Sequence, residues 1–299
     1  MIGNALRILV GYLTGTGNLE PLEFGDVPYP YPEKIVDGKK HKLCYVSAGS
    51  GRGSRILFLH PGSGDVTAFA PQMAALSKKR KVGAVDLPGH GKSRRVTEPT
   101  TPEDMALEVW AAMDRLSEKK LSLVGNSLGG GVALSMALQH PERVDKLVLI
   151  AAPGTRRTNA LERTLFSLVM GRTSKNPSMG RLRFIIEGLM FHRPCVASGA
   201  LVEKMLRLKA GKDYAQWRQS QQFIMESILH FNVLDRLHEI TIPTLILWGR
   251  QDRMMPLSEA NRFNHRIADS KLVFIDRCGH LPQLEQPEQV TRALSSFLL

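Results

Sequence analysis

The sequence has few cysteines and no long, uninterrupted apolar run. Its 299 residues include three cysteines, widely spaced and without a Cys-x-x-Cys pair: Cys44, Cys195 and Cys278. An odd and scattered set of this kind argues against a disulfide framework or a zinc site and fits a reducing compartment. No apolar stretch approaches the roughly 20 residues of a membrane-spanning helix. We therefore expect a cytoplasmic protein with no metal and no cofactor, with association to a membrane surface as an open alternative.

The amino-terminal segment 1–13 is apolar but short. Arg7 interrupts it and no convincing small-residue cleavage site follows, which argues against a signal peptide. Its apolar residues recur near helical spacing: Ile2, Leu6, Leu9, Val10 and Leu13. This pattern predicts a helix packed on its own domain or on a second subunit. An interfacial helix lying on a membrane is the alternative, and the sequence leaves the oligomeric state open.

Aromatic residues are also sparse, at 6%, whereas basic residues are in excess and give a net charge of +12. The excess gathers between Thr155 and Arg218, where thirteen lysines and arginines stand against four acidic residues. A solvated basic surface explains such a run, and so does attraction to an anionic membrane or an acidic substrate. The scarcity of aromatics and the lack of a recognition motif argue against nucleic acid. We expect a small-molecule substrate of anionic or lipid-like character, with a peripheral membrane contact through the amino terminus and this basic segment as a further option.

The remaining composition, 43% hydrophobic and 23% charged, is that of a folded globular protein large enough to build its own core. Apolar runs predict strands at residues 33–36, 41–47, 55–59, 81–86, 121–124, 144–151, 244–248 and 271–275. Helical patterns fall at residues 67–79, 101–117, 132–139, 256–267 and 287–299. Strands that alternate with helices and read as continuous apolar runs predict an α/β fold, a three-layer α/β/α sandwich around a mostly parallel, twisted sheet.

One stretch breaks this alternation. Between residues 152 and 238 helical patterns dominate and no strand is evident. We therefore divide the chain into an amino-terminal segment (1–32), an α/β core (33–154 and 239–299) and a helical cap, or lid, inserted into that core (155–238).

The most informative motif follows the strand at 121–124. Residues 125–129 read Gly-Asn-Ser-Leu-Gly and lead into the helix at 132–139. A serine between two glycines at a strand–turn–helix junction is typical of a nucleophile on a strained turn, where larger neighbours would collide. The turn presents the Ser127 hydroxyl and places the Leu128 N–H beside the helix amino terminus. The alternative is a serine that merely caps the helix.

A serine nucleophile needs a base, and the base needs an acid to orient it. Downstream of Ser127, Asp252 follows the strand at 244–248 and His280 follows the strand at 271–275. The carboxyl ends of parallel strands meet at one edge of a sheet, where open α/β sheets bind ligands. The three residues are therefore predicted to meet, in the chain order Ser, Asp, His.

Three further motifs accompany them: His-Pro-Gly at 60–62, Asp-Leu-Pro-Gly-His-Gly-Lys-Ser at 86–93 and Cys-Gly-His at 278–280. Together these stretches resemble the α/β-hydrolase fold family in its serine-nucleophile branch. The resemblance covers residues 33–299 apart from the inserted helices, which stand where the family carries its lid. It implies that Ser127 is the nucleophile, that His280 is the general base and then acid, and that Asp252 holds the imidazole.

The oxyanion hole of such an enzyme needs two backbone N–H donors. One is expected from Leu128. The family usually has His-Gly in the loop after the strand at 55–59, whereas this chain has His-Pro there, and Pro61 has no N–H. The resemblance therefore assigns the second donor to Gly62, with Ser63 as the weaker alternative.

Other residues near these motifs are expected to contact substrate or to serve structure. The candidate substrate contacts are Ser63, Asn126 and Leu281. Four residues are expected to be structural: His60, Asp86, Asp235 and Cys278. The first two would bind loop backbone. Related dehalogenases and epoxide hydrolases carry an aspartate at the elbow, so the serine argues against both.

Three functions remain open, and the first is favoured: esterase- or lipase-like hydrolysis of a carboxylic ester through an acyl-enzyme. The second is hydrolysis of a carbon–carbon bond in an acidic dienoate, because the elbow is similar to that of hydrolases of aromatic ring-cleavage products. A cap arginine would clamp that dienoate, with three candidates: Arg181, Arg183 and Arg193. Two features oppose this second function. Leu281 stands where that group of hydrolases tends to have tryptophan, and the loop at 61–65 differs from that group's usual glycine–proline pattern. The third is a non-catalytic ligand-binding protein, which has no need of an intact triad.

Overall fold

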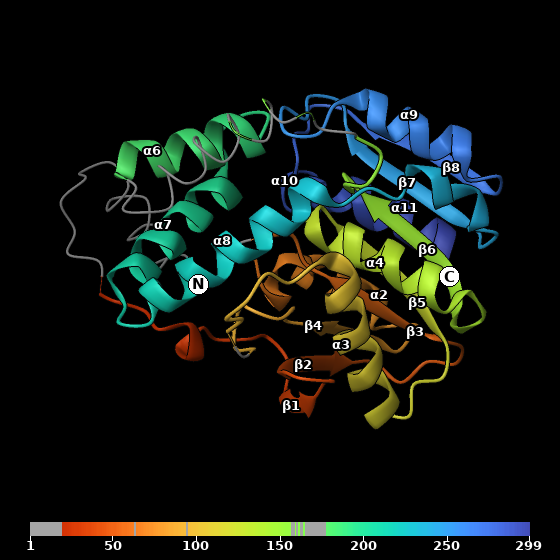
Figure 1. Ribbon diagram of the computed structural model, residues 1–299, viewed down its shortest axis with the longest axis horizontal. Helices are drawn as coiled ribbons and strands as arrows, with labels where there is room; N and C mark the ends of the chain where they lie inside the picture. Colours follow the sequence, from red (N-terminus) through yellow and green to blue (C-terminus); the bar gives the residue numbers. More distant parts are fainter. Residues whose placement is uncertain are drawn as a thin grey trace.

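The computed structural model describes residues 20–62, 64–93, 95–156 and 178–299, together with residues 159, 161 and 164. A single eight-stranded sheet forms the centre of this part of the chain (Figure 1). Its strands are β1 (Glu33–Asp37), β2 (Lys42–Ala48), β3 (Arg55–Leu59), β4 (Val82–Val85), β5 (Leu121–Asn126), β6 (Val144–Ile150), β7 (Thr244–Gly249) and β8 (Ser270–Ile275).

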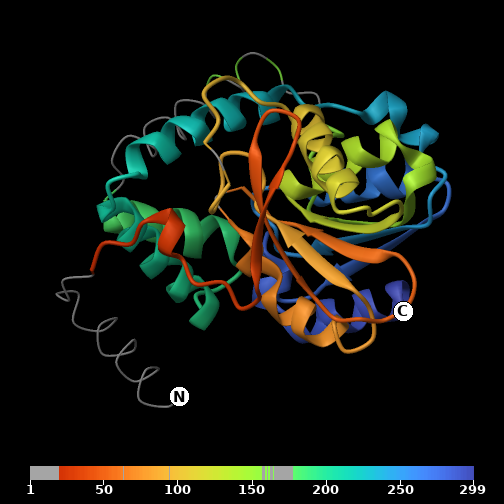
Figure 2. The same ribbon diagram turned by 90° about the horizontal axis from the view of Figure 1, so that it is seen from below.

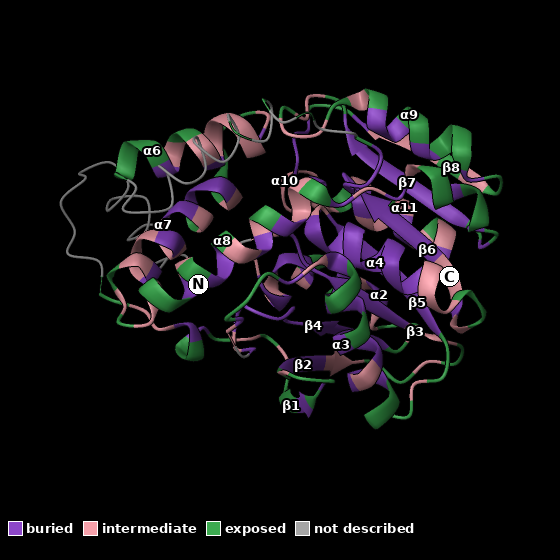
Figure 3. Cartoon of the chain, in the orientation of Figure 1, coloured by how far each residue is buried: buried purple, intermediate pink, exposed green. Residues whose placement is uncertain are grey.

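The order of strands across the sheet is β1-β2-β4-β3-β5-β6-β7-β8. The pairs β1–β2 and β2–β4 are antiparallel, and every pairing from β4 to β8 is parallel. Strands β5 and β7 are buried at every residue, which is why they read as mostly apolar runs (Figure 3). The prediction of a mostly parallel sheet is confirmed.

Helices cover both faces of the sheet. They are α2 (Ala70–Leu76), α3 (Pro102–Arg115), α4 (Leu128–Gln139), α9 (Leu257–Arg266), α10 (Pro282–Glu285) and α11 (Pro287–Leu298). The described residues also form four short 3-10 helices, named η1, η2, η3 and η5: Phe24–Asp26, Val66–Phe69, Pro141–Arg143 and Leu234–Glu239. One core cluster contains buried residues of α3, α4 and α9, and a second contains those of α2 and α11. The two clusters give the predicted three-layer sandwich.

A further group of helices lies beside the sandwich: α6 (Met179–Arg183), the π-helical turn η4 (Phe184–Met190), α7 (Val196–Ala210) and α8 (Tyr214–His230) (Figure 1). We call these elements the cap. Buried residues of η4, α7 and α8 form a third cluster with Phe24 and Val27 of the amino-terminal segment and with Leu281. Figure 2 shows the described part of that segment, in red, running past the cap helices before it enters β1. The predicted cap bounds, 155 and 238, stay a prediction.

Within the described ranges, no helix has the length and apolarity needed to cross a membrane. The helix predicted at 1–13 lies outside the described residues.

Candidate active site

Ser127 sits at the junction of β5 and α4 in a strained backbone conformation. Its φ is 51° and its ψ is −120°, a region that residues with a side chain rarely occupy. A Cβ on Gly125 would collide with the carbonyl oxygen of Gly129, and a Cβ on Gly129 would collide with that of Leu59. The glycines thus permit the tight turn that the sequence predicts. The Ser127 side chain makes no capping hydrogen bond to α4, so helix capping does not explain the serine.

Asp252 and His280 meet at the carboxyl ends of β7 and β8. The His280 Nδ1 lies 2.8 Å from an Asp252 carboxylate oxygen, and both side chains are fully buried. The other Asp252 oxygen accepts the backbone N–H groups of Met254 and Met255, at 2.8 and 2.9 Å. The carboxylate is therefore fixed on both sides and accepts the Nδ1 proton. This tautomer leaves the Nε2 lone pair of His280 free to take a proton, as a general base requires.

The two backbone groups proposed for the oxyanion hole lie side by side. A Cβ built on Gly62 would stand 4.0 Å from the Cβ of Leu128, and Leu128 is the first residue of α4. The loop that carries Gly62 is held by His60, whose Nδ1 donates to the Pro61 carbonyl at 2.8 Å and whose Nε2 accepts the Leu87 N–H at 3.0 Å. His60 has the structural role expected from the sequence, and burial lowers its pKa to about 4.

Asp86 also has the expected loop-fixing role. Its buried carboxylate accepts the backbone N–H groups of Val66 and Lys92, at 2.9 and 2.8 Å, and the Tyr29 hydroxyl at 2.6 Å. Burial and the nearby charge of Asp65 raise the pKa of Asp86 to about 7. The hydrogen bonds show that Asp86 anchors three segments to one another.

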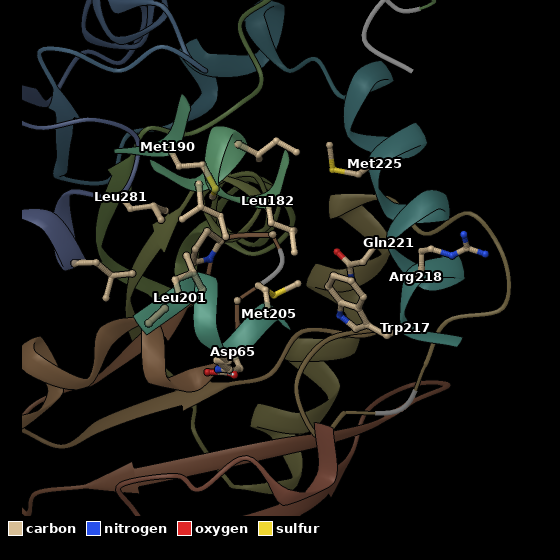
Figure 4. Close-up of a pocket in the computed structure, with 18 of the residues that line it drawn as sticks. Asp65, Leu182, Met190, Leu201, Met205, Trp217, Arg218, Gln221, Met225 and Leu281 are labelled. Atoms are coloured by element: carbon tan, nitrogen blue, oxygen red, sulfur yellow. Dashed lines mark hydrogen bonds and ion pairs between the residues drawn. The ribbon is translucent and has the colours of Figure 1, made fainter. Parts of the chain in front are cut away.

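A cavity of about 610 Å³ lies between the core loop at 61–68 and the cap (Figure 4). Gly62 and Leu281, the neighbour of His280, form part of its wall, so the cavity adjoins the predicted catalytic groups. Most of the wall is apolar and comes from cap residues, among them Leu182, Ile186, Met190, Leu201, Met205, Trp217 and Met225. Such a cavity suits an apolar small molecule.

The charged residues of this wall were not predicted. They are Asp65, Lys204, Arg218 and Glu226. None of the arginines predicted to clamp an acidic substrate, Arg181, Arg183 and Arg193, lines the cavity. Arg181 and Arg183 belong to α6 and Arg193 to the segment between η4 and α7, and other residues of the cap line the cavity. Lys204 pairs with Asp65, which precedes it by 139 residues. Local sequence patterns do not predict a contact between residues so far apart in the chain.

Two further site predictions have different outcomes. Ser63 lies outside the described residues. Asn126 is fully buried and absent from the cavity wall. Its amide donates to the carbonyls of Ile150 and His280, at 3.0 and 3.3 Å, and its oxygen accepts from Gln283 at 2.9 Å. Asn126 therefore joins the nucleophile turn to the backbone of His280, which explains a buried amide here better than a substrate contact does.

Alternative chemistries find little support at this site. Burial raises the pKa of the Cys278 thiol and so opposes a thiolate nucleophile, in line with the packing role expected for it. Among the described residues, no group of three or more histidine, cysteine, aspartate and glutamate side chains is arranged to hold a metal ion.

A family model described as "alpha/beta hydrolase fold" matches residues 55–287. The chain is 32% identical over 267 residues to a 2-hydroxy-6-oxo-2,4-heptadienoate hydrolase of Pseudomonas putida, an alignment that covers 83% of this chain and 90% of the relative.

Two solved structures are similar over most of their length. One is an N-acyl homoserine lactone degrading enzyme, with a TM-score of 0.75 and 25% identity, covering 89% of this chain and 100% of the other. The other is a bacterial membrane phospholipase A, with a TM-score of 0.77 and 24% identity, covering 98% and 91%. At this identity the phospholipase likeness shows the fold alone.

Proposed function

The chain belongs to the α/β-hydrolase fold family, and on that premise we propose that it is a serine hydrolase that cleaves a carboxylic ester through an acyl-enzyme. The observation that carries the proposal is the buried 2.8 Å contact between His280 Nδ1 and Asp252, at the same edge of the sheet as the strained Ser127 turn. Loop packing alone needs neither a serine at a positive φ nor a histidine whose Nε2 is left free.

The proposed reaction follows from these positions. The His280 Nε2 takes the proton of the Ser127 hydroxyl as its oxygen attacks the ester carbonyl. The N–H groups of Gly62 and Leu128 stabilise the negative charge on the carbonyl oxygen. His280 then protonates the departing alcohol, which leaves an acyl-enzyme. In the second half, water gives its proton to His280 and attacks the acyl carbon, and the acid departs as Ser127 regains its proton.

The cavity supports a substrate with an apolar, uncharged acyl group. Its wall is mostly aliphatic, and its four charged residues are two acids and two bases, which leaves no net charge for an anionic substrate to meet. The Lys204 ammonium is already paired with the Asp65 carboxylate. An ester with a medium-length aliphatic acyl chain fits these surroundings.

A second candidate is hydrolysis of a carbon–carbon bond in a ring-cleavage dienoate. The Pseudomonas putida relative, a 2-hydroxy-6-oxo-2,4-heptadienoate hydrolase, favours it. The same nucleophile turn and the same base would serve that reaction, which also passes through an attack on a carbonyl. The dienoate carboxylate needs a cationic partner, however, and the two cations in the cavity wall are accompanied by two acids.

One set of assays separates these candidates. We expect p-nitrophenyl hexanoate to be hydrolysed, and the Ser127→Ala variant to lose the activity by at least about a thousandfold. Dienoate turnover far above ester turnover would reverse the ranking of the two reactions. A chain that turns over neither substrate and takes no fluorophosphonate label at Ser127 would be a non-catalytic binding protein.

We also propose a peripheral membrane contact for the cap. Three apolar side chains are exposed on α6, on η4 and at the start of α7: Met179 at 43%, Phe184 at 63% and Val196 at 91%. Two exposed arginines, Arg181 and Arg193, lie in the same stretch of chain. Apolar side chains next to cations are typical of surfaces that bind anionic lipid.

Vesicle co-sedimentation tests this contact. We expect binding to vesicles that contain anionic phosphatidylglycerol, weaker binding to pure phosphatidylcholine, and a loss with Phe184→Ser. Equal sedimentation of the variant and the unmodified protein would contradict a role for the cap. Sedimentation unchanged by deletion of residues 1–13 would argue against an interfacial helix at the amino terminus.

A further inference from the structure

An ion pair between the core and the cap is built into the cavity wall. The Asp65 carboxylate, on the loop that carries Gly62, contacts the Lys204 ammonium of α7. Asp65 is 4% exposed, and the Lys204 side chain is 24% exposed. The other oxygen of Asp65 accepts the Thr67 hydroxyl and the Thr67 N–H, the latter at 2.9 Å. Figure 4 shows Asp65 below Met205 and Leu201 at the edge of the cavity.

In this ion pair the charges of Asp65 and Lys204 compensate each other. Burial opposes ionisation of Asp65, but the adjacent Lys204 and the bonds from Thr67 hold the pKa of Asp65 below its usual range, so the carboxylate is charged. A second buried acid, Asp86, lies near enough for Asp65 to raise its pKa. Lys204 therefore balances an acidic environment and is not a free cation facing the cavity.

From this we propose that the Asp65–Lys204 pair is a selectivity determinant of the cavity, which admits neutral acyl groups and rejects acyl groups that end in a carboxylate. The inference rests on the proposed ester hydrolysis and specifies its substrate class. A carboxylate that enters the cavity must leave water, and such a transfer is costly unless a cation compensates it. Asp65 already occupies the ammonium of Lys204 and repels the entering anion.

The substitution Asp65→Asn separates selectivity from structure. The asparagine keeps the shape of the side chain and an oxygen for the Thr67 N–H, while it leaves the Lys204 ammonium uncompensated in the cavity wall. The opposite single variant, Lys204→Met, is less informative because it leaves two buried carboxylates together and is expected to unfold the loop. The double variant Asp65→Asn, Lys204→Met removes both charges and is the matched control.

The experiment uses two substrates of equal chain length, p-nitrophenyl hexanoate and mono-p-nitrophenyl adipate, which differ in a terminal methyl or carboxylate. We expect the unmodified enzyme to prefer the hexanoate ester. Asp65→Asn should shift the ratio of kcat/KM values toward the adipate ester by at least about tenfold, and the double variant should return the ratio to the preference for hexanoate. The same ratio is measured for binding, as dissociation constants in the Ser127→Ala background.

Each result decides the proposal. A ratio that does not move in Asp65→Asn, or that moves equally in the double variant, overturns it and leaves the pair a purely structural link. A preference of the unmodified enzyme for the adipate ester overturns it as well. If neither ester is turned over, the proposed function fails, and the dissociation constants still decide whether the pair selects against a terminal carboxylate.

Discussion

At the scale of single residues, the property that matters most for the proposed chemistry is which nitrogen of His280 carries the proton. Asp252 decides this, because its two oxygens accept from separate directions: one from His280 Nδ1 and the other from the backbone of Met254 and Met255. In the proposed reaction the carboxylate would also stabilise the imidazolium that forms when His280 takes a proton.

Asp252→Asn tests that role. The asparagine fits the same space but brings an N–H donor, so it favours the wrong tautomer of His280. We expect kcat for p-nitrophenyl hexanoate to fall by about 10³- to 10⁴-fold with little change in thermal stability. The control is Asp276→Asn, an exposed acid paired with Arg250 at the same edge of the sheet, which should retain full activity. A kcat for Asp252→Asn within tenfold of the unmodified enzyme would contradict the assignment.

His60 provides a prediction about pH. The pKa of His60 is about 4 in the folded protein, whereas the ordinary value for histidine, expected in the unfolded chain, is 6.5. Between pH 6.5 and 4 the unfolded chain therefore binds a proton that the folded chain does not. His60 therefore lowers the free energy of unfolding as the pH falls from 6.5 toward 4, by on the order of 3 kcal/mol, and has no such effect above pH 6.5. Buried His90, with a pKa of about 3, acts in the same direction.

Asp86 opposes this trend, because its raised pKa of about 7 makes the folded state bind more protons between pH 4 and 7. The His60→Gln variant isolates the histidine. Its free energy of unfolding in urea, measured from pH 7.5 to 4.5, should depend less steeply on pH than that of the unmodified protein. Parallel curves would show that His60 titrates normally.

At the scale of elements, the β1–β2 hairpin depends on a helix that lies apart from it in sequence. The buried carboxylate of Glu108, in α3, accepts the backbone N–H groups of three successive turn residues: Lys39, Lys40 and His41. The bonds close a turn that returns from Gly38 to His41, with a backbone bond of 2.7 Å. The hairpin is thus fixed to the face of the sheet that α3 covers.

Glu108→Ala should remove this link and leave three turn donors without a partner. We expect the free energy of unfolding to fall by about 2–4 kcal/mol, measured by urea denaturation. Glu98→Ala is the matched control, since Glu98 forms an exposed ion pair with Lys40 and should change stability by less than about 1 kcal/mol. Equal effects of the two variants would show that the turn does not depend on the buried carboxylate.

Elements were predictable from the sequence where a local pattern decides them. The predicted strand at 55–59 is β3 as observed, and 144–151 exceeds β6 by one residue, because a buried parallel strand is a continuous apolar run. The predicted helix at 67–79 divides into η2 and the shorter α2, since Asp65 caps a 3-10 turn before the helix begins. The four-residue α10 was not predicted, being too short to show a period.

The candidate site likewise has a part that local patterns predict and a part that they do not. Ser127, Asp252 and His280 follow strands, so the parallel sheet that the sequence predicts brings them to one edge. Lys204 reaches Asp65 only because α7 packs over the core loop, and that packing depends on contacts between distant segments. The cavity wall is therefore the part of the site that the sequence describes least well.

At the scale of the whole molecule, residues 20–29 connect the cap to the core. We call these residues the strap. The strap binds the turn between α7 and α8, where Phe24 N donates to Asp213 at 3.1 Å, and it reaches the core where the Tyr29 hydroxyl donates to Asp86. The ring of Phe24 stacks on Trp217 at 5.2 Å, and Trp217 lines the cavity. The position of the cavity wall thus depends on a segment that lies far in sequence from the proposed catalytic residues.

Phe24→Ala tests whether the strap holds the cap in place. Phe24 is 4% exposed and lies between Trp217 and the Arg95 guanidinium, so its truncation removes a buried ring and costs about 3–5 kcal/mol of packing. Because the loss falls on the cap cluster, we expect KM for p-nitrophenyl hexanoate to rise several-fold, while kcat for the acetate ester, which needs less of the cavity, changes little. Limited proteolysis should cleave the cap sooner. Phe184→Ala, which truncates an exposed ring on the same cap, should leave KM and proteolysis unchanged. If the two variants behave alike, contacts among the cap helices hold the cap in place, and the strap does not contribute to its position.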